Sequence, residues 1–81
     1  MEIKSNEKNG MTSAKEIMNK YLISYQMLNH YTDLGLLPVL LRMGNVRYYN
    51  RVVVDKRIKK MRDFMKEGYS LQLVRKKLVG I

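Results

Sequence analysis

Residues 24–37 read Ser-Tyr-Gln-Met-Leu-Asn-His-Tyr-Thr-Asp-Leu-Gly-Leu-Leu, and they predict a short helix over residues 24–34. Ser24 is a typical N-cap residue, because its hydroxyl can accept an otherwise unpaired N–H of the first turn. Gly35 is free to adopt the left-handed conformation that ends many helices. Apolar and aromatic residues recur at three-residue spacing and predict the buried side of this helix: Leu28, Tyr31 and Leu34.

The opposite side of this helix carries polar or amphipathic side chains: Tyr25, Gln26, Asn29, His30 and Asp33. They are rich in hydrogen-bonding groups, but only Asp33 has a firm charge. A helix surface that meets only solvent usually carries charged residues such as lysine and glutamate instead. We therefore interpret this side as a contact surface.

Chain length and composition indicate one small domain over residues 11–81, preceded by a disordered polar segment over residues 1–10. Cysteine is absent, which excludes disulfides and thiolate metal sites. No apolar run approaches the ~20 residues that a membrane-spanning helix needs. We expect a cytoplasmic, nucleoid-associated protein without membrane contact.

The formal net charge of +9 lies in one half of the chain. Residues 1–37 carry equal numbers of basic and acidic side chains, whereas residues 38–81 carry twelve lysines and arginines against three acids. Such an asymmetry is typical of a protein that binds a polyanion. A solvated basic surface without a partner is the plain alternative.

A first helix is predicted from about Ser13 to Lys20, and Ser13 with Glu16 matches a capping box. Only residues 21–23 separate it from the helix over residues 24–34. Two short helices joined in this way are typical of a helix-turn-helix, whose second helix enters the major groove of DNA. An αα corner without a nucleic-acid role fits this fragment equally well.

Two β-type runs follow, at residues 39–42 and 46–49, around Gly44 and Asn45, which tolerate positive φ. They predict a hairpin with an arginine on each strand, a wing beside the groove. We expect its apolar side chains to pack on the helices: Val39, Leu41, Val46 and Tyr48.

Asn50 and Ser70 then predict the starts of a helix over residues 51–66 and a last helix. The predicted fold is mainly α, a winged helix-turn-helix of four helices with a two-stranded wing between the second and third.

In this order the pieces resemble the DNA-binding domain of the MerR (mercury-resistance regulator) family over about residues 12–79. The resemblance rests on Leu28-Asn29-His30-Tyr31 with Gly35-Leu36-Leu37-Pro38, on Val46-Arg47-Tyr48-Tyr49 and on Gly68-Tyr69-Ser70-Leu71. Leu22 replaces the family's turn glycine, Asn29-His30 replaces an Arg-Tyr pair, and the first wing strand is a residue longer before Arg42. The family's usual dimerisation helix and effector domain are not expected here, because the chain ends at Ile81.

The resemblance implies that Tyr31, Arg47 and Tyr49 contact the DNA backbone and that Tyr25 and Gln26 face the groove. From their chemistry, Gln26 and Asn29 can each bind adenine through two hydrogen bonds. The residues predicted to meet base edges are Tyr25, Gln26, Asn29 and His30. Those predicted to meet phosphates are Ser24, Tyr31, Arg42, Arg47, Tyr49, Arg51 and Lys56.

The expected partners are double-stranded DNA and a second copy of the chain on repeated half-sites. His30 is the only histidine and the carboxylates mostly lie beside basic residues, so we expect no enzymatic activity, cofactor or metal. Transcriptional regulation is the role that the resemblance favours. An accessory or anchoring role in plasmid or phage partition, segregation or excision is the alternative. From another class, residues 51–66 could form a basic protein-interaction module or dock on an anionic membrane surface.

Overall fold

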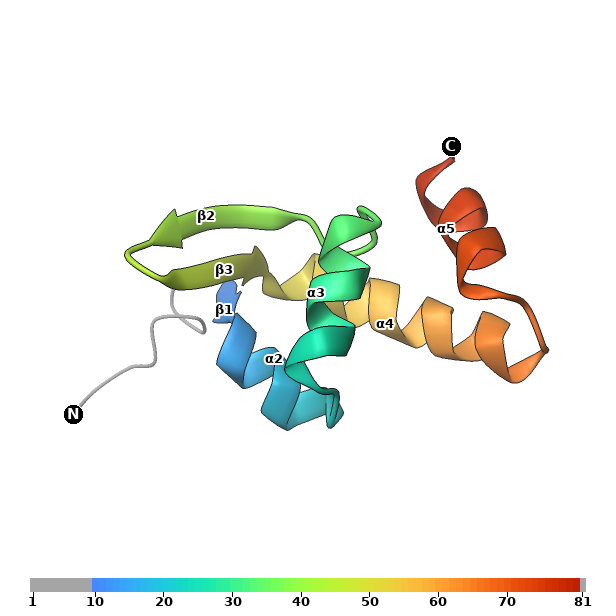
Figure 1. Ribbon diagram of the computed structural model, residues 1–81, viewed down its shortest axis with the longest axis horizontal. Coiled ribbons are helices and arrows are strands. Elements are labelled where there is room, and N and C mark those ends of the chain that lie inside the picture. Colours follow the sequence, from blue (N-terminus) through green and yellow to red (C-terminus); the bar gives the residue numbers. More distant parts are fainter. Residues whose placement is uncertain (1–9, 81) are drawn as a thin grey trace.

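The computed structural model describes residues 10–80 and is a mixed fold of four helices and one antiparallel sheet (Figure 1). The elements in chain order are β1 (Met11–Ser13), α2 (Ala14–Tyr21), α3 (Tyr25–Asp33), β2 (Val39–Met43), β3 (Val46–Asn50), α4 (Arg51–Lys66) and α5 (Leu71–Val79). The disordered segment expected over residues 1–10 lies, apart from Gly10, outside the described residues. No helix within residues 10–80 has the length and apolar character to cross a membrane.

The predicted helix starts are confirmed by side-chain caps. One residue before each helix, a side-chain oxygen accepts the backbone N–H three positions later; these residues are Ser13, Ser24, Asn50 and Ser70. The capping box at α2 is complete, because Ser13 N also donates to Glu16 Oε1 at 2.9 Å. Each helix therefore begins where local chemistry alone places it.

The sheet has one strand more than the predicted hairpin. Its order is β1-β3-β2, so the expected two-stranded wing is wrong in its strand count. β1 pairs antiparallel with β3 and places Thr12 opposite Tyr49. A strand of three residues carries no readable alternation of polar and apolar side chains, and β1 exists because β3 offers a free edge.

β2 contains a β-bulge before Arg42. Val39 pairs with Tyr49 and Leu41 with Tyr48, which leaves Leu40 without a partner in β3. Leu40 is 53% exposed, as the extra residue of a bulge often is. From Leu41 onward the register is regular again.

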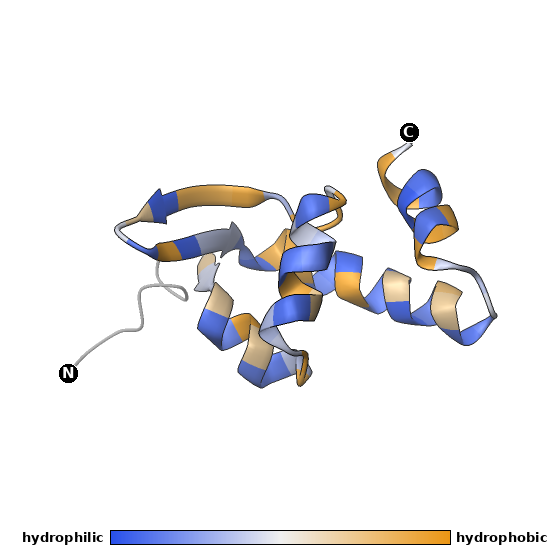
Figure 2. Ribbon diagram, viewed as in Figure 1, coloured by the Kyte–Doolittle hydropathy of each residue, from blue (hydrophilic) through white to orange (hydrophobic). Residues whose placement is uncertain are grey.

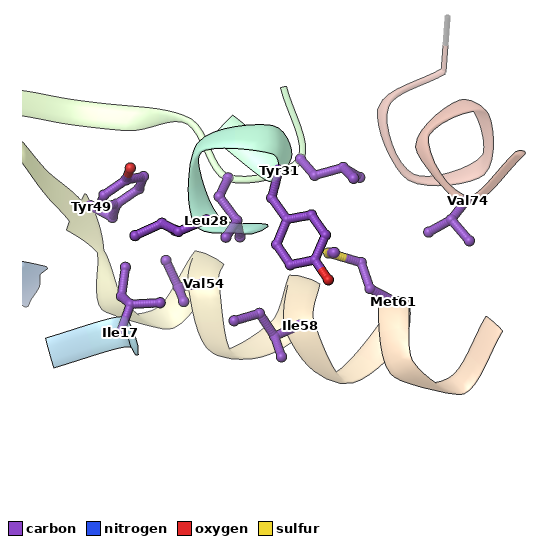
Figure 3. Close-up of a cluster of buried hydrophobic side chains, with 10 residues drawn as sticks. Ile17, Leu28, Tyr31, Tyr49, Val54, Ile58, Met61 and Val74 are labelled. Atoms are coloured by element: carbon purple, nitrogen blue, oxygen red, sulfur yellow. The ribbon is translucent and has the colours of Figure 1, made fainter. Parts of the chain in front are cut away.

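The core forms where the inner side of α3 packs on α4 (Figure 3). Leu28 and Tyr31 of α3 are buried with Val54, Ile58 and Met61 of α4. Other elements add fully buried side chains to this cluster: Ile17 from α2, Leu36 and Leu37 from the segment after α3, and Val74 from α5. Full burial of one such aliphatic side chain stabilises the fold by about 1.5–3 kcal/mol.

The hairpin contributes a different side chain to this core from the ones expected. Tyr49 is fully buried, whereas Leu41 and Val46 are exposed and Tyr48 is half-buried. Of the four predicted residues, only Val39 packs against the buried cluster. The expectation was wrong because β2 is apolar on both sides, so its sequence does not define which side faces the helices.

A hydrogen bond between side chains joins α2 to α4. Tyr21 Oη donates to Asp55 Oδ1 at 2.8 Å. Burial, reinforced by this bond and by the charge of Asp55, raises the pKa of Tyr21 to about 12. The same bond, together with Lys59, lowers the pKa of Asp55. The contact therefore requires a neutral Tyr21 and an ionised Asp55.

We predict that Tyr21→Phe lowers the free energy of unfolding by about 1 kcal/mol at neutral pH, through loss of this hydrogen bond. The folded pKa of Tyr21 lies above its usual value, so its contribution is present below about pH 10 and is lost as pH rises through about 12. The contribution of Asp55, whose pKa is lowered in the folded protein, is lost as pH falls below its usual pKa of about 3.9. Urea unfolding of both proteins from acid to alkaline pH should show that the advantage of the wild type shrinks toward both extremes. Tyr25→Phe is the control, and a constant difference across pH would contradict the assignment.

A second prediction concerns Leu22, which ends α2 in the left-handed conformation with φ 55° and is 89% exposed. This conformation costs an L-residue about 1–2 kcal/mol, whereas glycine adopts it freely. Glycine also gains freedom in the unfolded chain, worth about 0.5–1 kcal/mol. Leu22→Gly should therefore raise the free energy of unfolding by up to about 1 kcal/mol. Leu22→Ala keeps the Cβ and should change little, so an equal rise in both variants would refute backbone strain as the cause.

Candidate nucleic-acid interface

The outer side of α3 is available for contact along its length. Tyr25, Gln26 and His30 are exposed, Asn29 is half-buried, and Ser24 is exposed at the start of the helix. Gln26, Asn29 and His30 lie on the outer side because Leu28 and Tyr31 occupy the inner side of the helix. The ribbon of α3 is accordingly mostly hydrophilic (Figure 2).

Arg47 of β3 joins the hairpin to this side of α3. Its Nη2 donates to Asn29 Oδ1 at 2.6 Å. Its guanidinium carbon lies 5.7 Å from the ring centre of Tyr25 and 5.8 Å from that of Tyr49. Cation–π contacts at such distances favour a fixed guanidinium. The structure therefore brings together four of the predicted site residues: Tyr25, Asn29, Arg47 and Tyr49.

Arg42 lies directly opposite Arg47 in the β2–β3 ladder. Residues paired in this way project from the same face of a sheet, so both cations lie on the face that Tyr49 shares. Arg42 is exposed. Like charges directly opposite each other are destabilising, and an anion placed between them would relieve the repulsion. We call the set Tyr25, Gln26, Asn29, His30, Arg42 and Arg47 the α3–hairpin surface.

Arg51 and Lys56, also predicted to contact phosphate, lie apart from this surface. Together with Lys20 and Asp55 they line a hollow at the start of α4, which we call the α4 basic hollow. Lys56 points away from the core, because it is two positions from both Val54 and Ile58, which face inward. The predicted phosphate contacts thus fall into two groups.

Tyr31 and Tyr49 are core residues. Tyr31 is 7% exposed and Tyr49 is 0% exposed. Burial raises the pKa of Tyr31. The Tyr49 hydroxyl lies 2.9 Å from Thr32 Oγ1, whose own proton goes to the carbonyl of Leu28, so Tyr49 is the donor. The two tyrosines position α3 and the hairpin, and neither belongs to the exposed surface.

Three other basic side chains act within the fold. Arg57 donates to the carbonyl of Leu36, Arg62 to that of Tyr21, and Arg75 to that of Leu34, at 3.0, 2.5 and 2.9 Å. These carbonyls lie at or just beyond the ends of α2 and α3, where backbone acceptors lack helical partners. The cations therefore hold helix ends in place, which a count of charges along the sequence does not reveal.

Lys15 and Asn45 were missed by sequence reasoning. They line a second hollow with Tyr25 and Arg47, between α2, α3 and the tip of the hairpin. No sequence signal separates Lys15 from the other lysines, since its place depends on how α2 packs. Within residues 10–80 no group of three or more histidine, cysteine or acidic side chains is arranged to hold a metal ion.

No protein-family model matches this sequence, and no match to it was found among curated proteins or solved structures.

We predict that Tyr49→Phe lowers the free energy of unfolding by about 1 kcal/mol, because the buried hydrogen bond to Thr32 is lost while the ring still fills its site. Tyr48→Phe is the matched control, since Tyr48 is half-buried and has no hydrogen bond through its hydroxyl to any described residue. Chemical denaturation of both variants measures the difference. Equal losses would contradict the structural role assigned to the Tyr49 hydroxyl.

Proposed function

We propose that this chain is a sequence-selective binder of duplex DNA, with α3 as the recognition helix of a winged helix-turn-helix and the β2–β3 hairpin as its wing. The hydrogen bond between Arg47 and Asn29 carries the proposal. It places a cationic hairpin directly beside an exposed helix surface rich in hydrogen-bonding groups. Base readout and phosphate binding need these two surfaces side by side.

Base contacts are proposed for the exposed side of α3. Gln26 is exposed and can form two hydrogen bonds with adenine, while the ring of Tyr25 can contact a thymine methyl group. His30 lies one turn further along the same exposed side. The position of Tyr25 and Gln26 at the start of α3 supports the proposal, because recognition helices place their N-terminal residues against base edges.

Phosphate contacts are proposed for Arg42 and Arg47, with Lys15 beside Arg47. The facing arginines form a site of concentrated positive charge that a phosphate would neutralise. The net charge of +9 adds a long-range attraction that speeds encounter with DNA. Arg51 and Lys56 would reach the duplex only if it also passed the α4 basic hollow.

The biological role follows from the resemblance to the MerR family, and we propose transcriptional regulation, with two copies on repeated half-sites. The related alternative is an accessory or anchoring factor in plasmid or phage maintenance. Mapping the bound sites separates these uses, since promoter spacers favour regulation and repeat arrays near an origin or attachment site favour anchoring. A basic interaction module on α4 has less support, because Arg57 and Arg62 already bind backbone carbonyls and Lys59 pairs with Asp55.

The proposal predicts strongly salt-dependent binding to duplex DNA. If three to five phosphates are neutralised, log affinity should fall with log salt at a slope of about −3 to −4.5. Arg42→Gln should weaken binding to all sequences and reduce the slope by about one. Fluorescence anisotropy with labelled duplexes over a range of salt concentrations measures both quantities.

Lys60→Gln is the matched control, because it removes one exposed charge from α4 outside the α3–hairpin surface and should leave the slope unchanged. Lys56→Gln reports whether the α4 basic hollow also meets DNA. Binding that does not respond to salt, or that Lys60→Gln and Arg42→Gln weaken equally, would overturn the proposed interface.

A further inference from the structure

We infer that Arg47 determines which base Asn29 can read, by fixing the Asn29 amide as a hydrogen-bond donor toward DNA. This inference rests on the proposed DNA-binding function and goes one step beyond it. It replaces the expectation, drawn from sequence, that Asn29 contacts adenine through both its oxygen and its nitrogen.

The orientation of Asn29 follows from the chemistry of its partner. A guanidinium has only donors, so the Asn29 atom facing Arg47 Nη2 must be the amide oxygen. The separation of 2.6 Å is typical of a strong, charge-assisted hydrogen bond. With Oδ1 engaged by the hairpin, Nδ2 and its two protons make no hydrogen bond to any described residue and are left for DNA.

Arg47 is itself held, so this orientation is not easily lost. Its guanidinium lies over two rings, that of Tyr25 on α3 and that of Tyr49 in the core. Tyr49 is fully buried in the core cluster. The aromatic contacts therefore favour a guanidinium that lies beside Asn29.

A donor-only amide selects against the base expected for asparagine. Adenine offers N7 as an acceptor and N6 as a donor, and its N6–H would have to approach Oδ1 next to a positive charge. Cytosine also presents a donor in the major groove. Guanine offers two acceptors, N7 and O6, whereas adenine and thymine each offer one, N7 and O4. Asn29 should therefore favour guanine over adenine, thymine and cytosine.

Gln26 provides the contrast within the same helix. It lies three positions before Asn29 on the same side, is exposed, and makes no hydrogen bond to any described residue. Both groups of its amide are free, so it keeps the ability to bind adenine through two hydrogen bonds. Two amides on one surface would then read different base edges.

The test is a binding selection from a randomised duplex library with the full chain and its variants. Asn29→Ala identifies the base position that Asn29 reads. At that position the wild type should favour guanine over adenine by about fivefold or more. Arg47→Met keeps the aliphatic stem but removes the guanidinium, so it should weaken binding overall and move the preference toward adenine. Asn29→Asp keeps an acceptor for Arg47 without the outward donor, and should lose the preference.

The position that Gln26→Ala affects serves as the control and should not respond to Arg47→Met. An adenine preference at the Asn29 position in the wild type would overturn the inference. A base preference at this position that Arg47→Met leaves unchanged would also overturn it. So would a selection in which no base position depends on Asn29. These results leave DNA binding intact. If the folded wild type binds no duplex at any salt concentration, the proposed function fails and the inference fails with it.

Discussion

The packing of α3 on α4 determines which side chains of α3 are buried and which are exposed. Leu28 and Tyr31 are buried against Ile58 and its neighbours on α4, and this contact fixes the rotation of α3 about its axis. A helix with one side committed to a core has its other side committed to solvent or to a partner. The buried segment that follows α3 then sets where β2 begins. One apolar cluster therefore positions both the helix and the hairpin of the α3–hairpin surface.

The basic residues of this chain divide between holding the fold and facing outward. Arg57, Arg62 and Arg75 bind carbonyls near the ends of α2 and α3, and Lys59 pairs with Asp55. Guanidinium groups suit this work because they present several donors in a fixed geometry. The total charge therefore overstates the number of cations that are free to meet a polyanion. What supports a DNA interface is the position of a few of them, above all Arg47 beside α3.

The parts of the fold that the sequence predicted depend on local chemistry. Ser13, Ser24, Asn50 and Ser70 mark helix starts because the capped N–H lies three residues away along the chain. The features that the sequence did not predict depend on pairing between distant residues. β1 forms only against β3. Tyr49 is buried instead of Tyr48, and the sequence could not show which face of β3 turns to the core because the neighbouring strand β2 is apolar on both sides. The bond between Arg47 and Asn29 is of the same kind, since it requires the packed hairpin.

The bulge at Leu40 determines which face of the hairpin carries its two arginines. Side chains alternate along a strand, so one additional residue would turn Arg42 to the opposite face of the hairpin from Arg47. Because Leu40 has no partner in β3, Val39 still faces Tyr49 and Arg42 still faces Arg47. The irregularity is confined to one exposed side chain, and the buried and cationic ends of the hairpin are both preserved. The bulge thus keeps Arg42 and Arg47 together on one face of the hairpin, beside α3.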